Sequence, residues 1–199
     1  MISAIILAAG EGKRIGTTKA LLNWGNENLI NYQINSLSHK SITEKIVVVG
    51  SESEKVKKAI LRNEIKIAEN NDYLSGKTSS IKKGISYIGN DQNDILLIAV
   101  DQPRTEDLVN KVVNFHITNP LDKKISMPYK EGHGGHPIIF SNLFLDDLSK
   151  IKEESFGIRE IIKNNSESII RFKTTDVSSN IDINTSEDYE LFHNRFFNV

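Results

Sequence analysis

The chain has 199 residues, of which 38% are hydrophobic and 26% charged, and its formal net charge is −1. This length most often forms one domain, and the near-neutral charge argues against nucleic acid as a partner. The absence of cysteine excludes disulfides and thiolate metal sites. The first apolar run is too short to span a membrane and has no basic leader, so a cytoplasmic protein without a membrane partner is expected.

Predicted strands alternate with predicted helices along the chain. The strands are expected at 2–8, 45–49, 65–68, 95–100, 125–129, 137–140 and 169–173. The helices are expected at 29–38, 53–62, 79–88, 105–116, 142–150, 157–164 and 186–196. This alternation is typical of an α/β fold with three layers, in which helices cover both faces of a mostly parallel central sheet. No linker rich in Pro, Gly or Ser divides the chain, so residues 1–199 are expected to form a single domain.

The first predicted strand runs into a loop rich in glycines and cations. The loop contains Gly10, Gly12, Gly16, Lys13, Arg14 and Lys19. Glycine lets backbone N–H groups approach a ligand closely, and the cations would neutralise a ligand with several negative charges. A nucleoside triphosphate is therefore the expected ligand. The alternative is a strand-to-helix turn with surface lysines, because short glycine motifs often match by chance.

Two better-known phosphate loops do not match this segment. A Walker loop requires G-x-x-x-x-G-K-[ST], but neither Gly10 nor Gly12 has a glycine five residues later, and Ala20 follows Lys19. The dinucleotide fingerprint G-x-G-x-x-G fails because Ile15 occupies the position of the third glycine. The loop is therefore expected to be of a different type.

Asp101 directly follows the strand predicted at 95–100, and Pro103 ends that strand. Open α/β sheets bind ligands at the carboxyl ends of their strands, where a carboxylate can hold a divalent cation that bridges a triphosphate. Asp182 and Asn184 are two residues apart in a short extended segment and are expected to face the same side. Either could supply a second oxygen ligand. A role in turns or helix caps is the alternative for all three.

Two further segments are candidates for ligand contacts. Residues 76–80, Gly-Lys-Thr-Ser-Ser, precede a predicted helix, so their hydroxyls and free N–H groups could contact a base or ribose. Helix capping explains the Ser and Thr equally well. Residues 133–137, His-Gly-Gly-His-Pro, form a flexible run that could receive a second substrate. His136 could equally be a structural histidine buried against the sheet, because nothing places a nucleophile beside it.

Five blocks of the sequence resemble the MobA-like nucleotidyltransferases, most closely the molybdenum cofactor cytidylyltransferase branch. They are LAAGEGKRIGTTKALL at 7–22, NNDYLSGKTSSIKKG at 70–84, AVDQP at 99–103, GGHPIIF at 134–140 and DINTSEDY at 182–189. The blocks occur in the family's order and span nearly the whole chain. The resemblance implies a Rossmann-like nucleotidyltransferase fold of the GT-A type and transfer of CMP from CTP to a phosphate of molybdopterin, with release of pyrophosphate.

The same resemblance implies roles for individual residues. Arg14, Lys19 and Asp101 would be catalytic, and Asp101 and Asp182 would hold Mg²⁺ or Mn²⁺. Nucleotide contacts are implied for Leu7, Ala8, Ala9, Gly10, Gly12, Lys13, Arg14, Lys19, Gly76, Ser79 and Ser80. Acceptor contacts are implied for Gln102, Pro103, Gly135, His136 and Pro137. CTP is implied as the nucleotide because the first block reads LAAG rather than LAGG.

One departure from the family pattern concerns the acceptor. Relatives that act on molybdopterin often carry G-R-R-G-H-P, whereas residues 132–137 read Gly-His-Gly-Gly-His-Pro. An arginine pair would suit an anionic phosphate. A sugar or polyol phosphate therefore stays open as the acceptor, as does a non-catalytic binding or delivery protein that serves a molybdoenzyme. The intact Arg14, Lys19, Asp101 and Asp182 argue against a mere carrier.

Overall fold

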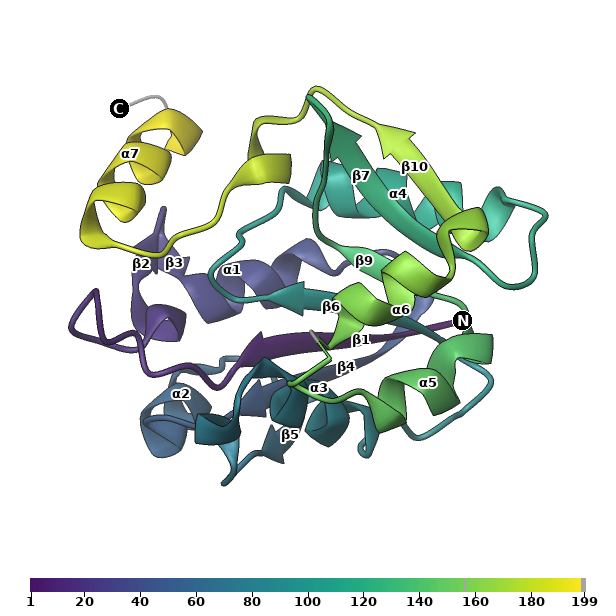
Figure 1. Ribbon diagram of the computed structural model, residues 1–199. Coiled ribbons are helices and arrows are strands. Elements are labelled where there is room, and N and C mark those ends of the chain that lie inside the picture. The colour runs from purple at the N-terminus through teal and green to yellow at the C-terminus, as the bar shows by residue number, and fades with distance from the viewer. Residues whose placement is uncertain (156, 198–199) are drawn as a thin grey trace.

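The computed structural model describes residues 1–155 and 157–197. Its centre is an eight-stranded sheet in the order β10-β7-β9-β6-β1-β4-β5, with β8 paired to β7 (Figure 1). The strands are β1 (Ile2–Ala8), β4 (Ile42–Val49), β5 (Lys66–Glu69), β6 (Asp94–Ala99), β7 (Ile125–Lys130), β8 (His133–Gly134), β9 (Ile138–Phe140) and β10 (Ile169–Lys173). Strands β8 and β9 pair antiparallel with their neighbours, and the pairs among β5, β4, β1 and β6 are parallel. The carboxyl ends of the parallel strands therefore share one edge.

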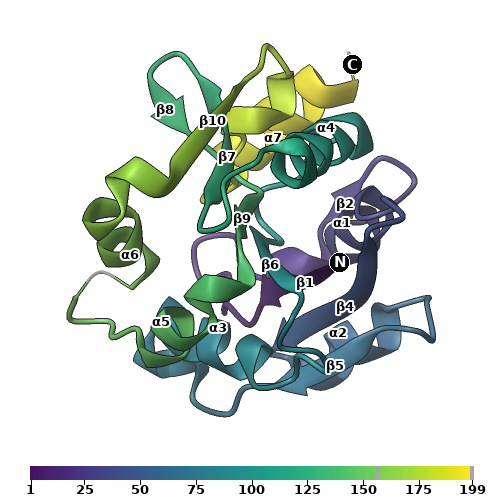
Figure 2. The ribbon, with the colours of Figure 1, turned by 90° about the vertical axis from the view of Figure 1, so that its right-hand side faces the viewer.

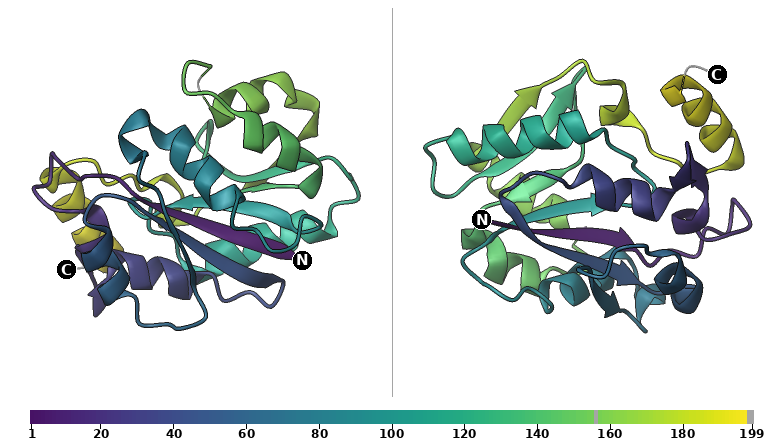
Figure 3. Two further views of the ribbon diagram at one scale, coloured as in Figure 1. Left: turned by 90° about the horizontal axis from the view of Figure 1, so that it is seen from below. Right: turned by 180° about the vertical axis from the view of Figure 1, so that it is seen from behind.

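Helices cover both faces of this sheet. They are α1 (Leu29–Ser36), α2 (Ser53–Ala59), α3 (Lys77–Ile85), α4 (Glu106–Thr118), α5 (Leu145–Lys150), α6 (Ile158–Asn164) and α7 (Ser186–Phe197). Helices α3, α5 and α6 lie on the face turned to the viewer in Figure 1, whereas α1 and α4 lie on the opposite face, seen in the right panel of Figure 3. The expected three-layer α/β architecture is confirmed. In the described part of the chain, no helix has the length and apolar character that a membrane crossing requires.

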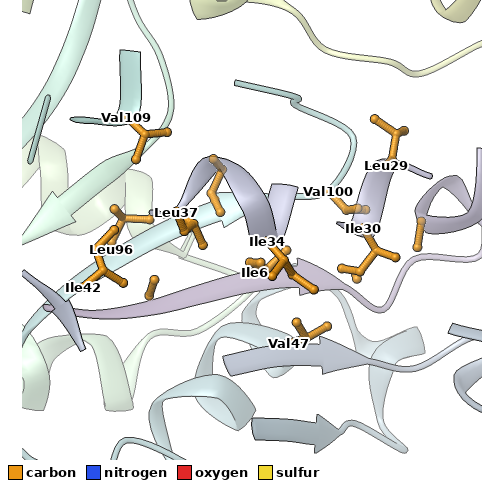
Figure 4. Packing of buried hydrophobic residues seen from close by; sticks show 14 of the residues in the cluster. Ile6, Leu29, Ile30, Ile34, Leu37, Ile42, Val47, Leu96, Val100 and Val109 are labelled. Atoms are coloured by element: carbon orange, nitrogen blue, oxygen red, sulfur yellow. The ribbon is translucent and has the colours of Figure 1, made fainter. Parts of the chain in front are cut away.

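The central strand β1 is buried along its whole length. Because side chains alternate along a strand, Ile5 and Leu7 pack into the cluster under α3, whereas Ile6 packs into the cluster under α1. Figure 4 shows Ile6 beside Ile30 and Ile34 of α1. A strand covered on both faces must be apolar at successive positions, which explains the unbroken apolar run that predicted it.

All seven predicted strands and all seven predicted helices are present; β1 and β10 have the predicted bounds, and the other elements have shifted ends. Strand β4 begins three residues earlier than expected, and α3 spans 77–85 instead of 79–88. The helix expected at 142–150 is divided into a 3-10 turn, Asn142–Phe144, and α5. Such differences arise at element ends, where local pattern carries the least information.

A two-stranded hairpin was not predicted. Its strands are β2 (Asn23–Trp24) and β3 (Glu27–Asn28), which are too short to show a periodic pattern. The hairpin presents the buried ring of Trp24, which packs against Phe196 of α7 with ring centroids 5.2 Å apart. This contact attaches the C-terminal helix to the segment that follows the glycine-rich loop.

Threonine hydroxyls cap the first turns of α4 and α7. The Thr105 hydroxyl accepts from the backbone N–H of Leu108 at 3.1 Å. Thr185 accepts from the N–H of Asp188 at 3.1 Å, and the Asp188 carboxylate accepts from the N–H of Thr185 at 2.9 Å. This reciprocal arrangement satisfies two free N–H groups at the start of α7 and holds the preceding segment in place.

Candidate active site

A first cavity of about 410 Å³ opens at the carboxyl ends of β1 and β6. It is lined by the glycine-rich loop, by the end of β6 and by the start of α3. The residues expected to bind nucleotide or metal that line it are Leu7, Ala9, Gly10, Gly12, Lys13, Arg14, Lys19, Gly76, Ser80 and Asp101. Tyr73, Lys77, Thr18 and Asn184 also line it. The edge of the sheet therefore brings together four segments that are distant in sequence.

The glycines of the loop differ in what they allow. Gly12 has a φ of +63°, and a Cβ there would lie 1.9 Å from the carbonyl oxygen of Thr17, so both backbone conformation and space require glycine. At Gly10, a Cβ would have no heavy atom within 4 Å. Gly12 thus has a structural explanation. Gly10 leaves open space at the cavity wall, and a ligand could approach its backbone there.

Lys19 is the centre of the charged contacts in this cavity. Its Nζ donates to Asp101 Oδ2 at 2.8 Å and to Asn184 Oδ1 at 3.3 Å. The backbone N–H of Ile183 donates to the carbonyl oxygen of Asp101 at 2.9 Å, which anchors the segment before α7 to the end of β6. The side-chain oxygens of Asp101 and Asn184 therefore both face the ammonium group of Lys19.

Asp182 and Asn184 line different cavities. Asn184 lines the first cavity, whereas Asp182 lines a neighbouring one, and the side chain of Ile183 between them is buried. Asn184 is therefore the residue that joins Asp101 around Lys19. Magnesium and manganese favour oxygen ligands and often take one or two from the protein and the rest from phosphates and water. Asp101 and Asn184 fit such an ion, and no cluster of three His, Asp or Glu side chains suited to a metal occurs among the described residues.

A second cavity of about 820 Å³ adjoins the first, and Lys77 lines both. Three of the residues expected to contact the acceptor, Gln102, Gly135 and His136, lie in its wall. Part of the remaining wall comes from β7, α6 and β10, which the sequence did not connect with a site. Its residues include Tyr129, Arg159 and Arg171.

His136 is a neutral group in this wall. Burial, with the nearby cations of Lys77 and Arg104, lowers the pKa of His136 to about 3, although part of the residue still reaches solvent. Its Nδ1 lies 3.3 Å from the carbonyl oxygen of Leu97, an obligate acceptor, so we assign the ring proton to Nδ1. Nε2 is then a hydrogen-bond acceptor, and His136 does not supply positive charge to an anion.

Arg104 was not predicted as part of the site. The residue is 1% exposed, and its guanidinium donates to the carbonyl oxygens of His136 (2.8 Å), Ser178 (2.6 Å) and Ile181 (2.9 Å). Burial lowers the pKa of Arg104 to about 10, and Asp182 and other acids partly oppose this effect, so the group stays charged at neutral pH. It connects the turn after Asp101 to two other segments of the cavity wall. Arg104 stands between Pro103 and the cap residue Thr105, and this local sequence gives no sign that it is buried.

Four expected contacts lie elsewhere in the structure. Ala8 points to the opposite face of β1 from Leu7 and is 1% exposed in the core under α1, because side chains alternate along a strand. Ser79 lies outside the first cavity, and its hydroxyl donates to the carbonyl oxygens of Asp72 and Gly76. The remaining two, Pro103 and Pro137, are buried and line neither cavity. The structure therefore does not bring these four side chains to either cavity.

Comparison with known sequences yields a family match and distant relatives. The bifunctional protein GlmU of Blochmanniella pennsylvanica is 28% identical over 196 residues, which cover 89% of this chain and 42% of that protein. The nicotine blue oxidoreductase of Paenarthrobacter nicotinovorans is 31% identical over 103 residues, or 51% of this chain and 50% of that protein. The chain thus spans about half or less of the length of these curated relatives.

Solved structures share the fold at low identity. A nucleotidyl transferase from Methanothermobacter thermautotroptrophicus superposes with a TM-score of 0.82 at 20% identity, covering 100% of this chain and 98% of that one. A CMP:2-keto-3-deoxy-manno-octonic acid synthetase complexed with CTP gives 0.77 at 11% identity, covering 99% and 98%. The molybdopterin-guanine dinucleotide biosynthesis protein A of Archaeoglobus fulgidus gives 0.67 at 17% identity and covers 100% of both chains. These likenesses confirm the Rossmann-like nucleotidyltransferase fold.

The family model named MobA-like NTP transferase domain matches residues 4–169, which include the glycine-rich loop, Asp101 and the wall of the second cavity up to the start of β10. This match covers most of the chain. The protein therefore belongs to the family of MobA-like NTP transferase domains.

Proposed function

We propose that the protein transfers CMP from CTP to a phosphate of a small anionic acceptor, for which molybdopterin is the leading candidate, and releases pyrophosphate. One observation carries this proposal. Lys19, Asp101 and Asn184 converge in the cavity that the glycine-rich loop borders, and Lys77 connects this cavity to a second one. A triphosphate in the first cavity and an acceptor in the second would meet beside Lys77.

The chemistry requires no protein nucleophile. An oxygen of the acceptor phosphate attacks the α-phosphorus, a new P–O bond forms, and the bond to the β-phosphate oxygen breaks as pyrophosphate leaves. Arg14 and Lys19 would neutralise the β- and γ-phosphates, and the backbone at Gly10 would approach them closely. Asp101 and Asn184, with Asp182 as the alternative second ligand, would hold the divalent ion, which when bound supplies charge to the triphosphate.

The choice of CTP rests on two supports. The loop begins Leu-Ala-Ala-Gly, as in the cytidylyltransferase branch that the sequence resembles, and Leu7 and Ala9 line the cavity where the base would lie. A structural neighbour was solved with CTP. A manganese complex of a further neighbour, from Mycobacterium tuberculosis, supports a divalent ion at such sites.

A sugar or polyol phosphate is the second candidate acceptor. A neighbour named 4-diphosphocytidyl-2C-methyl-D-erythritol synthase, with a TM-score of 0.74, favours this alternative, as does the arginine-free segment at 132–137. The proposed activity as such does not depend on which acceptor is used.

A pyrophosphate-release screen tests the proposal. The four NTPs are crossed with molybdopterin, glycerol 3-phosphate and sugar phosphates in the presence of Mg²⁺ or Mn²⁺. We expect release only with an acceptor and fastest with CTP, and a loss of several orders of magnitude in Asp101→Asn. Asp147→Asn, which removes an equal charge from the exposed face of α5, is the control and should be fully active. NTP binding without release under every combination would instead indicate a carrier.

A further inference from the structure

Three cations of the second cavity have no ionic partner among the described residues. Lys77, Arg159 and Arg171 all line it, and none of them forms a salt bridge with any residue that the structure describes. Arg171 lies over the ring of Tyr129, with its Cζ 5.5 Å from the ring centroid. This stacking orients the guanidinium without neutralising it. The cavity therefore presents positive charge that a bound anion could use.

The same wall contains two carboxylates, those of Glu153 and Asp182. The Glu153 carboxylate accepts from the backbone N–H of Thr78 at 2.9 Å, and hydrogen bonds from Thr78 lower the pKa of Glu153. Among the acids that oppose the effect of burial on the pKa of Arg104, Asp182 has the largest influence. Neither acid pairs with Arg159 or Arg171. The imidazole of His136, in the same wall, is neutral.

The rest of the wall carries no charge. Uncharged polar groups come from Thr78, Gln102 and Tyr129, and the apolar side chains are Ile81, Met127, Ile138, Ile158, Ile162 and Ile169. The segment 132–137, where relatives often carry an arginine pair, supplies only Gly132, Gly134, Gly135 and His136 to the wall. Arg159 on α6 and Arg171 on β10 come from a later part of the chain and reach the same cavity. Figure 2 shows β8, β10 and α6 along one flank of the molecule.

We infer that Arg159 and Arg171 bind the acceptor's anionic group and replace the arginine pair that the segment 132–137 lacks. This inference rests on the proposed function, and it adds the residues that select a phosphorylated acceptor. Guanidinium groups bind phosphate in a bidentate manner, which fixes the orientation of the acceptor as well as its charge. Lys77, at the junction with the first cavity, lies where the attacking phosphate oxygen and the CTP would meet.

The test uses Arg159→Met and Arg171→Met, singly and together. Methionine keeps much of the side-chain length and removes the charge. Lys163→Met is the matched control, because Lys163 is an exposed cation on the same helix α6 and lies outside both cavities. With an accepted phosphate substrate from the screen, each arginine variant should raise KM for the acceptor about tenfold or more. KM for CTP and the thermal shift caused by CTP should stay at the wild-type values.

The outcomes separate this inference from the proposed function. Wild-type transfer together with an unchanged acceptor KM in the double variant would overturn the inference and leave the function intact. If the wild type transfers nothing, acceptor binding is measured directly by calorimetry with molybdopterin and with glycerol 3-phosphate. Weaker binding in the arginine variants than in Lys163→Met would then support the inference although the proposed reaction had failed. Equal binding in all variants, or no binding to the wild type, would overturn it.

Discussion

Gly10→Ala separates ligand binding from folding in the glycine-rich loop. The backbone of Gly10 is outside the left-handed region, and a methyl group there would meet no heavy atom within 4 Å. Without nucleotide the variant should be as stable as the wild type or about 0.4–1 kcal/mol more stable, because alanine restricts the unfolded chain. For a chain of this length that corresponds to a rise in Tm of about 1–4 °C.

The methyl group of Gly10→Ala should lower the affinity for nucleotide. At a concentration of about 100 times Kd, CTP would stabilise the wild type by about 2.7 kcal/mol, or roughly 5–11 °C in Tm. The new methyl group occupies the cavity wall that the phosphates would approach. A tenfold loss of affinity would reduce the stabilisation to about 1.4 kcal/mol at the same concentration. Thermal-shift titration with CTP and Mg²⁺ measures both quantities in one experiment.

Gly12→Ala and Gly16→Ala are the matched comparisons. Alanine at Gly16 has no steric contact but must adopt a φ of +78°, so a loss of about 1–2 kcal/mol is expected without nucleotide. Alanine at Gly12 also meets the carbonyl oxygen of Thr17 and should be the least stable of the three. A full CTP-induced shift in Gly10→Ala, or a destabilised nucleotide-free variant, would refute the reasoning.

Three further predictions concern charged groups. Lys19→Met should tighten Mn²⁺ binding in the absence of nucleotide, because the ammonium group no longer competes for Asp101, and it should weaken CTP binding. Electron paramagnetic resonance measures the Mn²⁺ affinity, and an unchanged affinity would contradict this prediction. Burial raises the pKa of Asp94, but hydrogen bonds from His116 and a backbone N–H lower it by more, so its contribution to stability is present above the usual pKa of about 4 and lost as pH falls below it. The difference in urea midpoint between wild type and Asp94→Asn should therefore shrink from pH 6 to pH 3, and a constant difference would contradict the assignment. Arg104→Lys should keep the charge but lose carbonyl contacts, which lowers Tm and raises the acceptor KM more than the CTP KM; equal rises would show a general structural effect.

Much of the fold could be predicted because its elements are specified by local patterns. A strand buried on both faces has to be apolar at successive positions, as β1 and β6 are, and Thr105 and Thr185 carry the side-chain acceptors that a helix start needs. The same logic placed Asp101 at the edge of the sheet where ligands bind. The hairpin around Trp24 escaped prediction because two-residue strands leave no period to detect.

The composition of the two cavities depended on the tertiary structure. Lys19 meets Asp101 and Asn184 across 82 and 165 positions of sequence, and no local pattern encodes such a distance. The sheet continues beyond β6 through β9 and β7 to β10, and this order of strands brings Arg171 of β10 to the second cavity, which Arg159 of α6 also lines. Periodicity within one element determines which face of that element is buried. Which functional side chains share a cavity is determined by the order of the strands and by the packing between elements, and those contacts form only when the whole chain folds.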